Sequence, residues 1–251
     1  MSDIVLYEVQ GRVALITLNR PDARNAVNGD VAAGVEAAID RMEEDSEVWV
    51  GIIRANTEGQ DRPVFCAGAD LKAINSGNAA ALNTARGGFA GFAYRERRKP
   101  VIVAVDGLAT AGGCEIVLAA DLVVATTRSA FGLAEVKRNL IAGAGGLFRL
   151  PRAIGQAAAM EAILTGEPIP AERLGHGFAG SEALRLAEQI TACAPLAVWA
   201  SRKVVLAAAY EDDETLKKLT NEQFATVLQS DDTKEGLTAF IEKRTPHWKG
   251  H

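Results

Sequence analysis

Two glutamates stand among apolar residues and close to glycines, where a carboxylate is unusual. Glu115 lies in "TAGGCEIVLAADL" (110–122), two residues after a glycine pair, and Glu135 lies in "SAFGLAEVKRNL" (129–140). Burying a carboxylate without a partner is costly, and two close carboxylates push one pKa up, so that one is protonated while the other is charged. The pattern predicts a general acid–base pair. The alternative for Glu115 is an exposed first-turn acid that favours the helix dipole.

Two glycine-bearing turns accompany these acids, "FCAGADL" (65–71) and "TAGGCE" (110–115). Each is expected to join a strand to a helix. The first N–H groups of a helix have no intrahelical partner, and small residues let a ligand approach them. If both turns face one cleft, the N–H groups of Ala69 and Gly112 can converge on one oxygen as an oxyanion hole. The alternative is that these are ordinary turn or close-packing glycines.

Other kinds of chemistry find little support in the sequence. The three cysteines form no CxxC pair, and two of the three histidines are at the C-terminus, leaving His176 without a G-x-S-x-G turn. The run "IAGAGGLFRLPR" (141–152) contains G-x-G-G rather than the dinucleotide fingerprint. We therefore predict no metal and no cofactor, and we expect 141–152 to be another glycine loop that starts a helix.

The charge balance and the hydropathy pattern restrict the partners. The formal net charge is −5 and the sequence pI is about 5.4, which disfavours nucleic acid. No signal peptide and no unbroken apolar stretch long enough for a membrane span is evident, so we expect a cytoplasmic protein with no membrane partner. The basic run "RERRK" (95–99) is expected to be a solvated face, with polyanion binding as the alternative.

The elements that must position these residues follow an α/β pattern. A hairpin is expected on both sides of Gln10-Gly11, and Asn28 is expected to cap a helix through about Glu44. Buried strands are expected at 48–55, at the start of "VFCAGADLKAI", at "VIVAV" and at "DLVVAT". Residues 80–98 look helical, and helices dominate after Gly145, most clearly at 198–209, 214–229 and 231–243. We divide the chain into a core of 1–190 and a helical region of 191–251.

The chain resembles the enoyl-CoA hydratase/isomerase (crotonase) superfamily over almost its whole length. The resemblance is carried by the order and spacing of several segments, namely "LNRPDARNAV", "FCAGADLK", "AVDGLATAGGCEIVLAADLVVA", "AFGLAEVKRNLIAGAGGLFRLPR", "ILTGEPIPAERL", "APLAVWASRKVV" and "EGLTAFIEKRTPHWKG". It implies a crotonase-like ββα spiral core, a helical C-terminal region that forms trimers or hexamers, and an acyl-CoA thioester as ligand. Coenzyme A is then part of the substrate.

The resemblance also implies roles for individual residues. Glu115 and Glu135 match the two glutamates that flank the water in hydratases, and Gly143 matches a backbone donor that helps to hold this water. The N–H groups of Ala69 and Gly112 match the oxyanion hole. The CoA site is expected to comprise Ala67, Ala69, Asp70, Leu71 and Lys72, with Phe240 and Lys243 of the C-terminal helix close by.

Retention of both glutamates favours addition of water across the 2,3 double bond of a 2-enoyl-CoA. The alternatives are an enoyl-CoA isomerase, a carnitinyl-CoA dehydratase-type enzyme, or a non-catalytic acyl-CoA-binding member. The sequence departs from the family in one place: after Phe178 an extended stretch is usual before the next helix, and here "AGSEALRLAEQI" follows directly.

Overall fold

The computed structural model describes residues 4–174 and 181–251, so the departure after Phe178 and the position of His176 lie outside the described residues. A five-stranded sheet has the order β1-β2-β3-β7-β9. These strands are β1 (Val5–Gln10), β2 (Val13–Leu18), β3 (Val50–Ala55), β7 (Val101–Val105) and β9 (Leu122–Ala125). Strands β1 and β2 form the expected hairpin, and the other neighbours run parallel.

Both faces of this sheet are covered by helices. Helix α1 (Gly29–Glu44) begins where Asn28 accepts a hydrogen bond from the N–H of Val31 (3.0 Å), as the sequence predicts. Its apolar side packs against one face of β2, and helix α6 (Ser181–Thr191) packs on the other. Residues of β2 alternate accordingly between the side of α1 (Ala14, Ile16, Leu18) and the side of α6 (Val13, Leu15).

A second sheet has the order β11-β10-β8-β4. It comprises β4 (Val64–Cys66), β8 (Leu108–Thr110), β10 (Ala130–Gly132) and β11 (Ile169–Pro170), and β4, β8 and β10 are parallel. Four short helices occur in the same part of the chain, namely α2 (Leu71–Asn75), α3 (Gly112–Leu118), α4 (Gly146–Ile154) and α5 (Gln156–Thr165). Helix α3 packs on β4 and β8, and α4 packs on α3 and α5. Single 3-10 turns occur at Pro21–Ala23, Ala79–Leu82, Glu135–Arg138 and Ala171–Leu174.

The expectation of a helix over 80–98 is wrong. The segment contains a 3-10 turn, the small strands β5 (Asn83–Thr84) and β6 (Gly88–Phe89), and turns. Its glycines explain the difference, because Gly88 and Gly91 have φ of +63° and +65°. At Gly91 a Cβ would lie 2.2 Å from the carbonyl oxygen of Ala32, so this loop packs directly on the backbone of α1.

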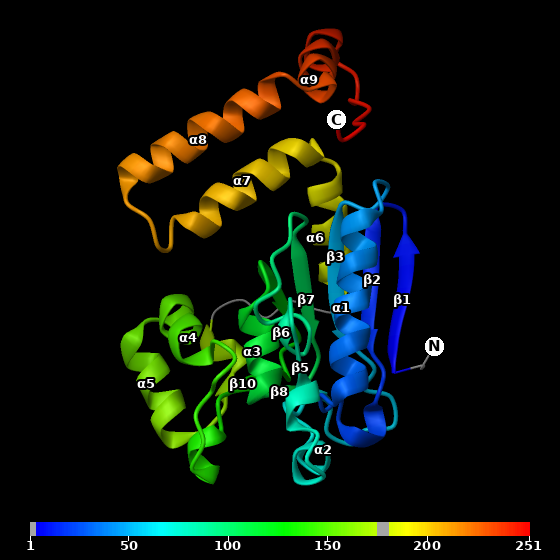
Figure 1. Cartoon of the computed structure of the whole chain (residues 1–251). Helices are drawn as coiled ribbons and strands as arrows, with labels where there is room; N and C mark the ends of the chain where they lie inside the picture. The colour runs from blue at the N-terminus through cyan, green and yellow to red at the C-terminus, as the bar shows by residue number, and fades with distance from the viewer. Residues whose placement is uncertain (1–3, 175–180) are drawn as a thin grey trace.

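The C-terminal helices are α7 (Pro195–Ala207), α8 (Asp213–Leu228) and α9 (Asp231–Glu242), close to the expected ranges. They extend beyond one end of the sheet, away from α2 and α5 (Figure 1). Helix α7 is attached to the core by Arg202, which donates to Asp121 at 2.9 Å, and by the Trp199 indole N–H, which donates to the carbonyl of Trp49 at 3.4 Å.

The basic run 95–99 is not the solvated face that its composition predicts. Arg95 pairs with Asp40 (2.5 Å), and Arg97, with a side chain only 5% exposed, pairs with Asp121 (3.3 Å). The Lys99 side chain is fully buried, and its ammonium donates to the carbonyls of Met42 and Asp45 at the C-terminal end of α1. Cations are favoured at this end of a helix, so part of the run serves the core.

Candidate active site

Three parallel strands bring the candidate residues to one edge of the second sheet. Strand β4 runs into the turn of Ala67 to Asp70, β8 runs into α3 with Glu115, and β10 is followed two residues later by the 3-10 turn that starts at Glu135. The carboxyl ends of parallel strands meet at the same edge, which is where open α/β sheets bind ligands. Segments far apart in the sequence thus converge there.

The two glycine turns lie against each other. A Cβ on Gly68 would lie 2.9 Å from the backbone nitrogen of Gly112, and a Cβ on Gly113 would lie 2.1 Å from the carbonyl oxygen of Cys66. Neither position has room for a side chain. These glycines are therefore close-packing residues, and their packing brings the Ala69 and Gly112 turns together.

The N–H of Ala69 is left available by its backbone pairing. In the bridge between Val27 and Ala69, the N–H of Val27 donates to the carbonyl of Gly68 and the N–H of Asp70 donates to the carbonyl of Val27, both at 2.8 Å. In such a parallel bridge the N–H of the bridged residue points away from the partner. The N–H of Gly112, as the first residue of α3, has no intrahelical acceptor.

Ala111 connects β8 to α3 in a strained conformation. Its φ is +50° and its ψ is −127°, a region that residues with a Cβ rarely adopt. Its N–H donates to the carbonyl of Gly132 at 2.8 Å, which ties the turn to β10. Such strain costs on the order of 1–3 kcal/mol and clusters at functional sites.

Glu115 is buried, with 3% of the residue exposed. Its Oε1 accepts hydrogen bonds from the N–H of Ala144 (2.7 Å) and from the N–H of Gly146 (2.9 Å). Burial raises the pKa of Glu115, and the two backbone N–H groups and the charge of Arg149 partly oppose this rise. The exposed first-turn acid is therefore excluded.

Glu135 is half-buried, and its Oε2 is buried without a hydrogen-bond partner among the described residues. Burial raises the pKa of Glu135, and the charge of Glu115 raises it further. Such coupling requires the two carboxylates to be near each other. Both carboxyls thus have a raised pKa, and the charge of Glu115 acts on Glu135. Their action as an acid–base pair stays a prediction.

Gly143 lies on the exposed side of the loop that binds Glu115. A Cβ there would meet only the carbonyl of Ile141, at 4.0 Å. The carbonyl of Gly143 accepts from the Tyr94 hydroxyl at 3.1 Å. The sequence motifs did not identify three groups of this loop region, namely the N–H donors of Ala144 and Gly146 to Glu115 and the side chain of Tyr94. The glycine run of 143–146 is the only sequence signal for them, because free N–H groups are expected where a loop begins a helix.

The expected CoA segment lies at the start of α2. Asp70 caps this helix by accepting from the N–H groups of Lys72 (3.0 Å) and Ala73 (3.4 Å), and it pairs with Arg20 at 3.1 Å. These contacts hold the pKa of Asp70 below its usual value despite burial. Leu71 and Lys72 are exposed, and the N–H of Ala67 donates to the carbonyl of Arg24 at 3.1 Å.

Phe240 and Lys243 do not lie beside this segment in the same chain. Phe240 is on α9, where it is 86% exposed, and Lys243 ends that helix with φ of +55°. Helix α9 and helix α2 are at opposite ends of the molecule (Figure 1). A chain in this conformation cannot bring both groups to one bound CoA.

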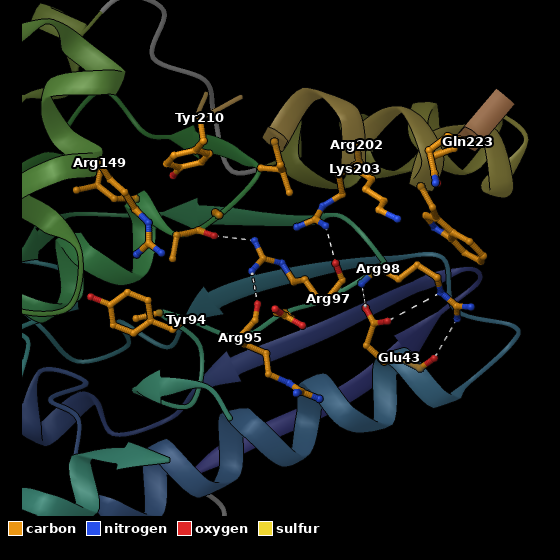
Figure 2. Close-up of a pocket in the computed structure, with 18 of the residues that line it drawn as sticks. Glu43, Tyr94, Arg95, Arg97, Arg98, Arg149, Arg202, Lys203, Tyr210 and Gln223 are labelled. Carbon is orange, nitrogen blue, oxygen red and sulfur yellow. Dashed lines mark hydrogen bonds and ion pairs between the residues drawn. The ribbon is translucent and has the colours of Figure 1, made fainter. Parts of the chain in front are cut away.

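A cleft of about 1230 Å³ separates the core from α7 and α8. Figure 2 shows Tyr94, Arg149 and Tyr210 near one end of it and Arg98 near Glu43 towards the other. Among the described residues that line the cleft, none is Glu115, Glu135 or Gly143. The cleft is therefore distinct from the edge at which the carboxylates meet. Within residues 4–174 and 181–251, no group of His, Cys, Asp and Glu is arranged to hold a metal ion.

No single helix in the described part of the chain is long and apolar enough to cross a membrane. Only the pair Ala183–Thr191 and Pro195–Ala207 meets the length and composition test together, and this pair is bent by 112°.

The fold and the site define a mixed α/β protein in which a buried and a half-buried glutamate, both with a raised pKa, accompany two packed glycine turns. The chain belongs to the enoyl-CoA hydratase/isomerase family, whose model matches residues 8–251. Carnitinyl-CoA dehydratase of Proteus mirabilis is 35% identical, with 100% of each chain covered. A probable mitochondrial enoyl-CoA hydratase of Dictyostelium discoideum is also 35% identical, over 96% of this chain and 89% of the relative.

The solved structures agree with this assignment. A crystal structure of an enoyl-CoA hydratase from Mycobacterium tuberculosis H37Rv superposes with a TM-score of 0.92 at 42% identity, with 100% of each chain covered. Together the family and its relatives indicate a hydratase- or lyase-type enzyme.

Proposed function

We propose that this chain is an acyl-CoA hydro-lyase that adds water across the 2,3 double bond of a 2-enoyl-CoA. The observation that carries the proposal is the coupled pair of Glu115 and Glu135, both with a raised pKa, at the strand edge that also holds the Ala69 and Gly112 turns. Carboxylates with raised pKa values are suited to act as acid and base near neutral pH.

The proposed reaction uses the groups as follows. One glutamate takes a proton from water, and the hydroxyl oxygen forms a bond to C3. The electrons of the double bond move to the thioester oxygen, where the N–H groups of Ala69 and Gly112 stabilise the enolate. The other glutamate then gives a proton to C2. The N–H of Gly143 is proposed to hold the water, for which the open space beside Gly143 leaves room.

We further propose that the C-terminal region assembles the protein into trimers or pairs of trimers. Helices α8 and α9 expose several large apolar side chains without cover in one chain, namely Phe224, Leu228, Leu237, Phe240 and Ile241. Several large exposed apolar side chains on neighbouring helices favour an interface. Assembly would also allow Phe240 and Lys243 of one copy to reach the CoA segment at Ala67 to Lys72 of another. Light scattering coupled to gel filtration measures the assembly, and a monomer would contradict this part of the proposal.

Loss of the enoyl-thioester ultraviolet absorbance with crotonyl-CoA tests the reaction class. We expect turnover by the wild-type chain and a fall of roughly 10²–10⁴-fold on replacing either glutamate by glutamine. Binding of CoA without turnover of any enoyl-CoA would instead support a non-catalytic member.

A second candidate is the dehydration of carnitinyl-CoA, which is favoured by the full-length similarity to the Proteus mirabilis enzyme. The same carboxylates and turns would serve that reaction, as they would an isomerisation. A panel of acyl-CoA thioesters followed by mass spectrometry of the products separates these activities, because hydration adds the mass of one water, dehydration removes it, and isomerisation leaves the mass unchanged.

A further inference from the structure

The loop of residues 143–146 is held from two sides. On one side its N–H groups bind a carboxylate, since Ala144 and Gly146 donate to Glu115. On the other side its carbonyls are bound by side chains: Gly143 accepts from the Tyr94 hydroxyl at 3.1 Å, and Ala144 accepts from Arg149 Nη1 at 3.1 Å. The orientation of these peptide groups thus depends on all three side chains.

Arg149 is fitted closely to the back of the loop. Gly145 has φ of +105°, which favours glycine, and a Cβ there would lie 2.5 Å from Arg149 Nη1, so the guanidinium would have to shift to admit a side chain. The guanidinium also lies over the ring of Tyr94, 5.2 Å from its centroid. It has no carboxylate partner among the described residues, and its charge acts on Glu115, whose pKa it lowers.

Tyr94 is held in turn by the glycine-rich loop before it. Its N–H donates to the carbonyl of Gly87 at 2.8 Å, and a Cβ on Gly88 would lie 2.6 Å from the tyrosine ring. Figure 2 shows Tyr94 and Arg149 close to each other at the end of the cleft, contributed by different segments of the chain. The pair lines this cleft, whereas the carboxylates do not, so it supports the loop from the side opposite to Glu115.

We propose that Tyr94 and Arg149 are positioning residues that fix the 143–146 loop, and through it the carboxylate of Glu115 and the N–H of Gly143. This inference rests on the proposed hydration. Neither side chain touches the substrate in this scheme. The carbonyl of Gly143, which binds Tyr94, and the N–H of Ala144, which binds Glu115, belong to one peptide group, so a rotation of this peptide changes both sides of the loop. The carbonyl of Ala144, which binds Arg149, belongs to the next peptide and lies between the two N–H donors to Glu115.

The charged and titratable groups around Glu115 belong to several elements. Glu135 is on the 3-10 turn, where burial and the charge of Glu115 raise its pKa and the charge of Arg138 opposes this rise. Arg149 on α4 favours the charged form of Glu115. Arg152 lies beyond Arg149 and stacks on Tyr210 at 4.4 Å. Removing the charge of Arg149 alone therefore shifts the balance towards protonated Glu115.

The substitution Tyr94→Phe removes only the hydroxyl and keeps the ring beneath Arg149. We expect kcat for crotonyl-CoA hydration to fall roughly 3- to 10-fold, the effect of one neutral hydrogen bond, with KM changed less than about twofold. In Arg149→Met the limb of the kcat profile that reports Glu115 should move to higher pH, whereas Arg149→Lys, which keeps the charge, should restore the limb. Tyr210→Phe is the matched control, because the Tyr210 hydroxyl makes no hydrogen bond to this loop, and it should leave kcat unchanged.

A readout independent of turnover separates this inference from the proposed function. Amide hydrogen exchange of Ala144 and Gly146, followed by NMR, should be faster in Tyr94→Phe and Arg149→Met than in the wild type, and unchanged in Tyr210→Phe. Unchanged protection of both amides in Tyr94→Phe, or a lower thermal midpoint with kcat and the pH profile unaffected, would overturn the positioning role. A wild-type chain that shows no turnover but the expected exchange pattern would overturn the hydration proposal while retaining the role of the pair in fixing the loop.

Discussion

Replacing Glu115 by glutamine or by alanine separates its chemical role from its structural one. The carboxylate makes both of its hydrogen bonds through a single oxygen, Oε1, to the N–H groups of Ala144 and Gly146. Glutamine supplies a carbonyl oxygen of the same shape at that place, so both bonds can persist. It cannot exchange a proton with water or with C2 of a substrate.

The magnitudes of the two effects differ enough to be distinguished. Loss of general acid–base action costs roughly 10²–10⁴-fold in kcat, or about 2.7–5.4 kcal/mol in the barrier. In Glu115→Gln each hydrogen bond weakens from a charged to a neutral one, about 1 kcal/mol apiece. Removal of a buried charge with a raised pKa offsets this loss. We therefore expect the stability of the glutamine variant to be close to that of the wild type.

Glu115→Ala should behave differently, because it removes the acceptor of both N–H groups. Two buried donors left without partners cost about 1–3 kcal/mol each, and the lost side chain leaves a cavity in addition. Thermal unfolding and crotonyl-CoA hydration, measured on both variants, give the comparison. A glutamine variant with kcat within about threefold of the wild type would refute the catalytic role. A glutamine variant that is destabilised as strongly as the alanine variant would show that the charge of the carboxylate, and not the shape of the acceptor, holds the loop.

Three further predictions follow from the strained, buried and coupled groups. We expect the thermal midpoint of Glu135→Gln to rise relative to that of the wild type as the pH increases from about 4 to about 8. A carboxyl whose pKa is raised in the folded state stabilises that state only at low pH, and this contribution is lost as the carboxyl ionises. A constant difference between the two midpoints across a pH series would contradict this. Ala111→Gly should raise the free energy of unfolding in urea by about 1 kcal/mol, since it relieves the positive φ, and a decrease would contradict the assignment of strain. A thiol-specific disulfide reagent should modify Cys193 rapidly in the native protein, and Cys66 and Cys114 only after unfolding, because burial raises the pKa of both to about 12; rapid native labelling of more than one thiol would show that the site opens.

The regular parts of the fold are predictable because local signals agree there with the tertiary structure. The cap at Asn28 and the hairpin at Gly11 depend on neighbouring residues, and both are found where the sequence places them. The prediction of a helix over 80–98 is wrong because the small residues of this segment are locally compatible with a helix. Its actual course is decided by close contact of Gly91 with the backbone of α1, and a distant contact of this kind leaves no periodic signal.

The same distinction applies to the site. The types and spacing of Glu115 and Glu135 suffice to predict an acid pair, because the apolar neighbours of both residues indicate a buried position. The partners of Glu115 are backbone groups of a loop that lies 29 and 31 residues further along the chain. Almost any residue can supply a backbone N–H, so the types and spacing of residues cannot identify these donors. Tyr94 is missed for the related reason that its partner is a carbonyl.

Several residues of the site have a locally unfavourable backbone conformation or environment, and the packing around them explains why these features persist. Ala111 keeps a positive φ, Glu115 is buried as an acid with a raised pKa, and Glu135 has a buried oxygen without a hydrogen-bond partner in the described parts of the chain. Each feature favours unfolding, and none could persist in a loosely packed turn. At Gly113 a Cβ would meet the carbonyl of Cys66 at 2.1 Å, so the start of α3 packs directly against the backbone at the end of β4. Contacts of the turns with the second sheet therefore hold the strained Ala111 turn in place, as preorganisation of the proposed acid–base and oxyanion groups would require.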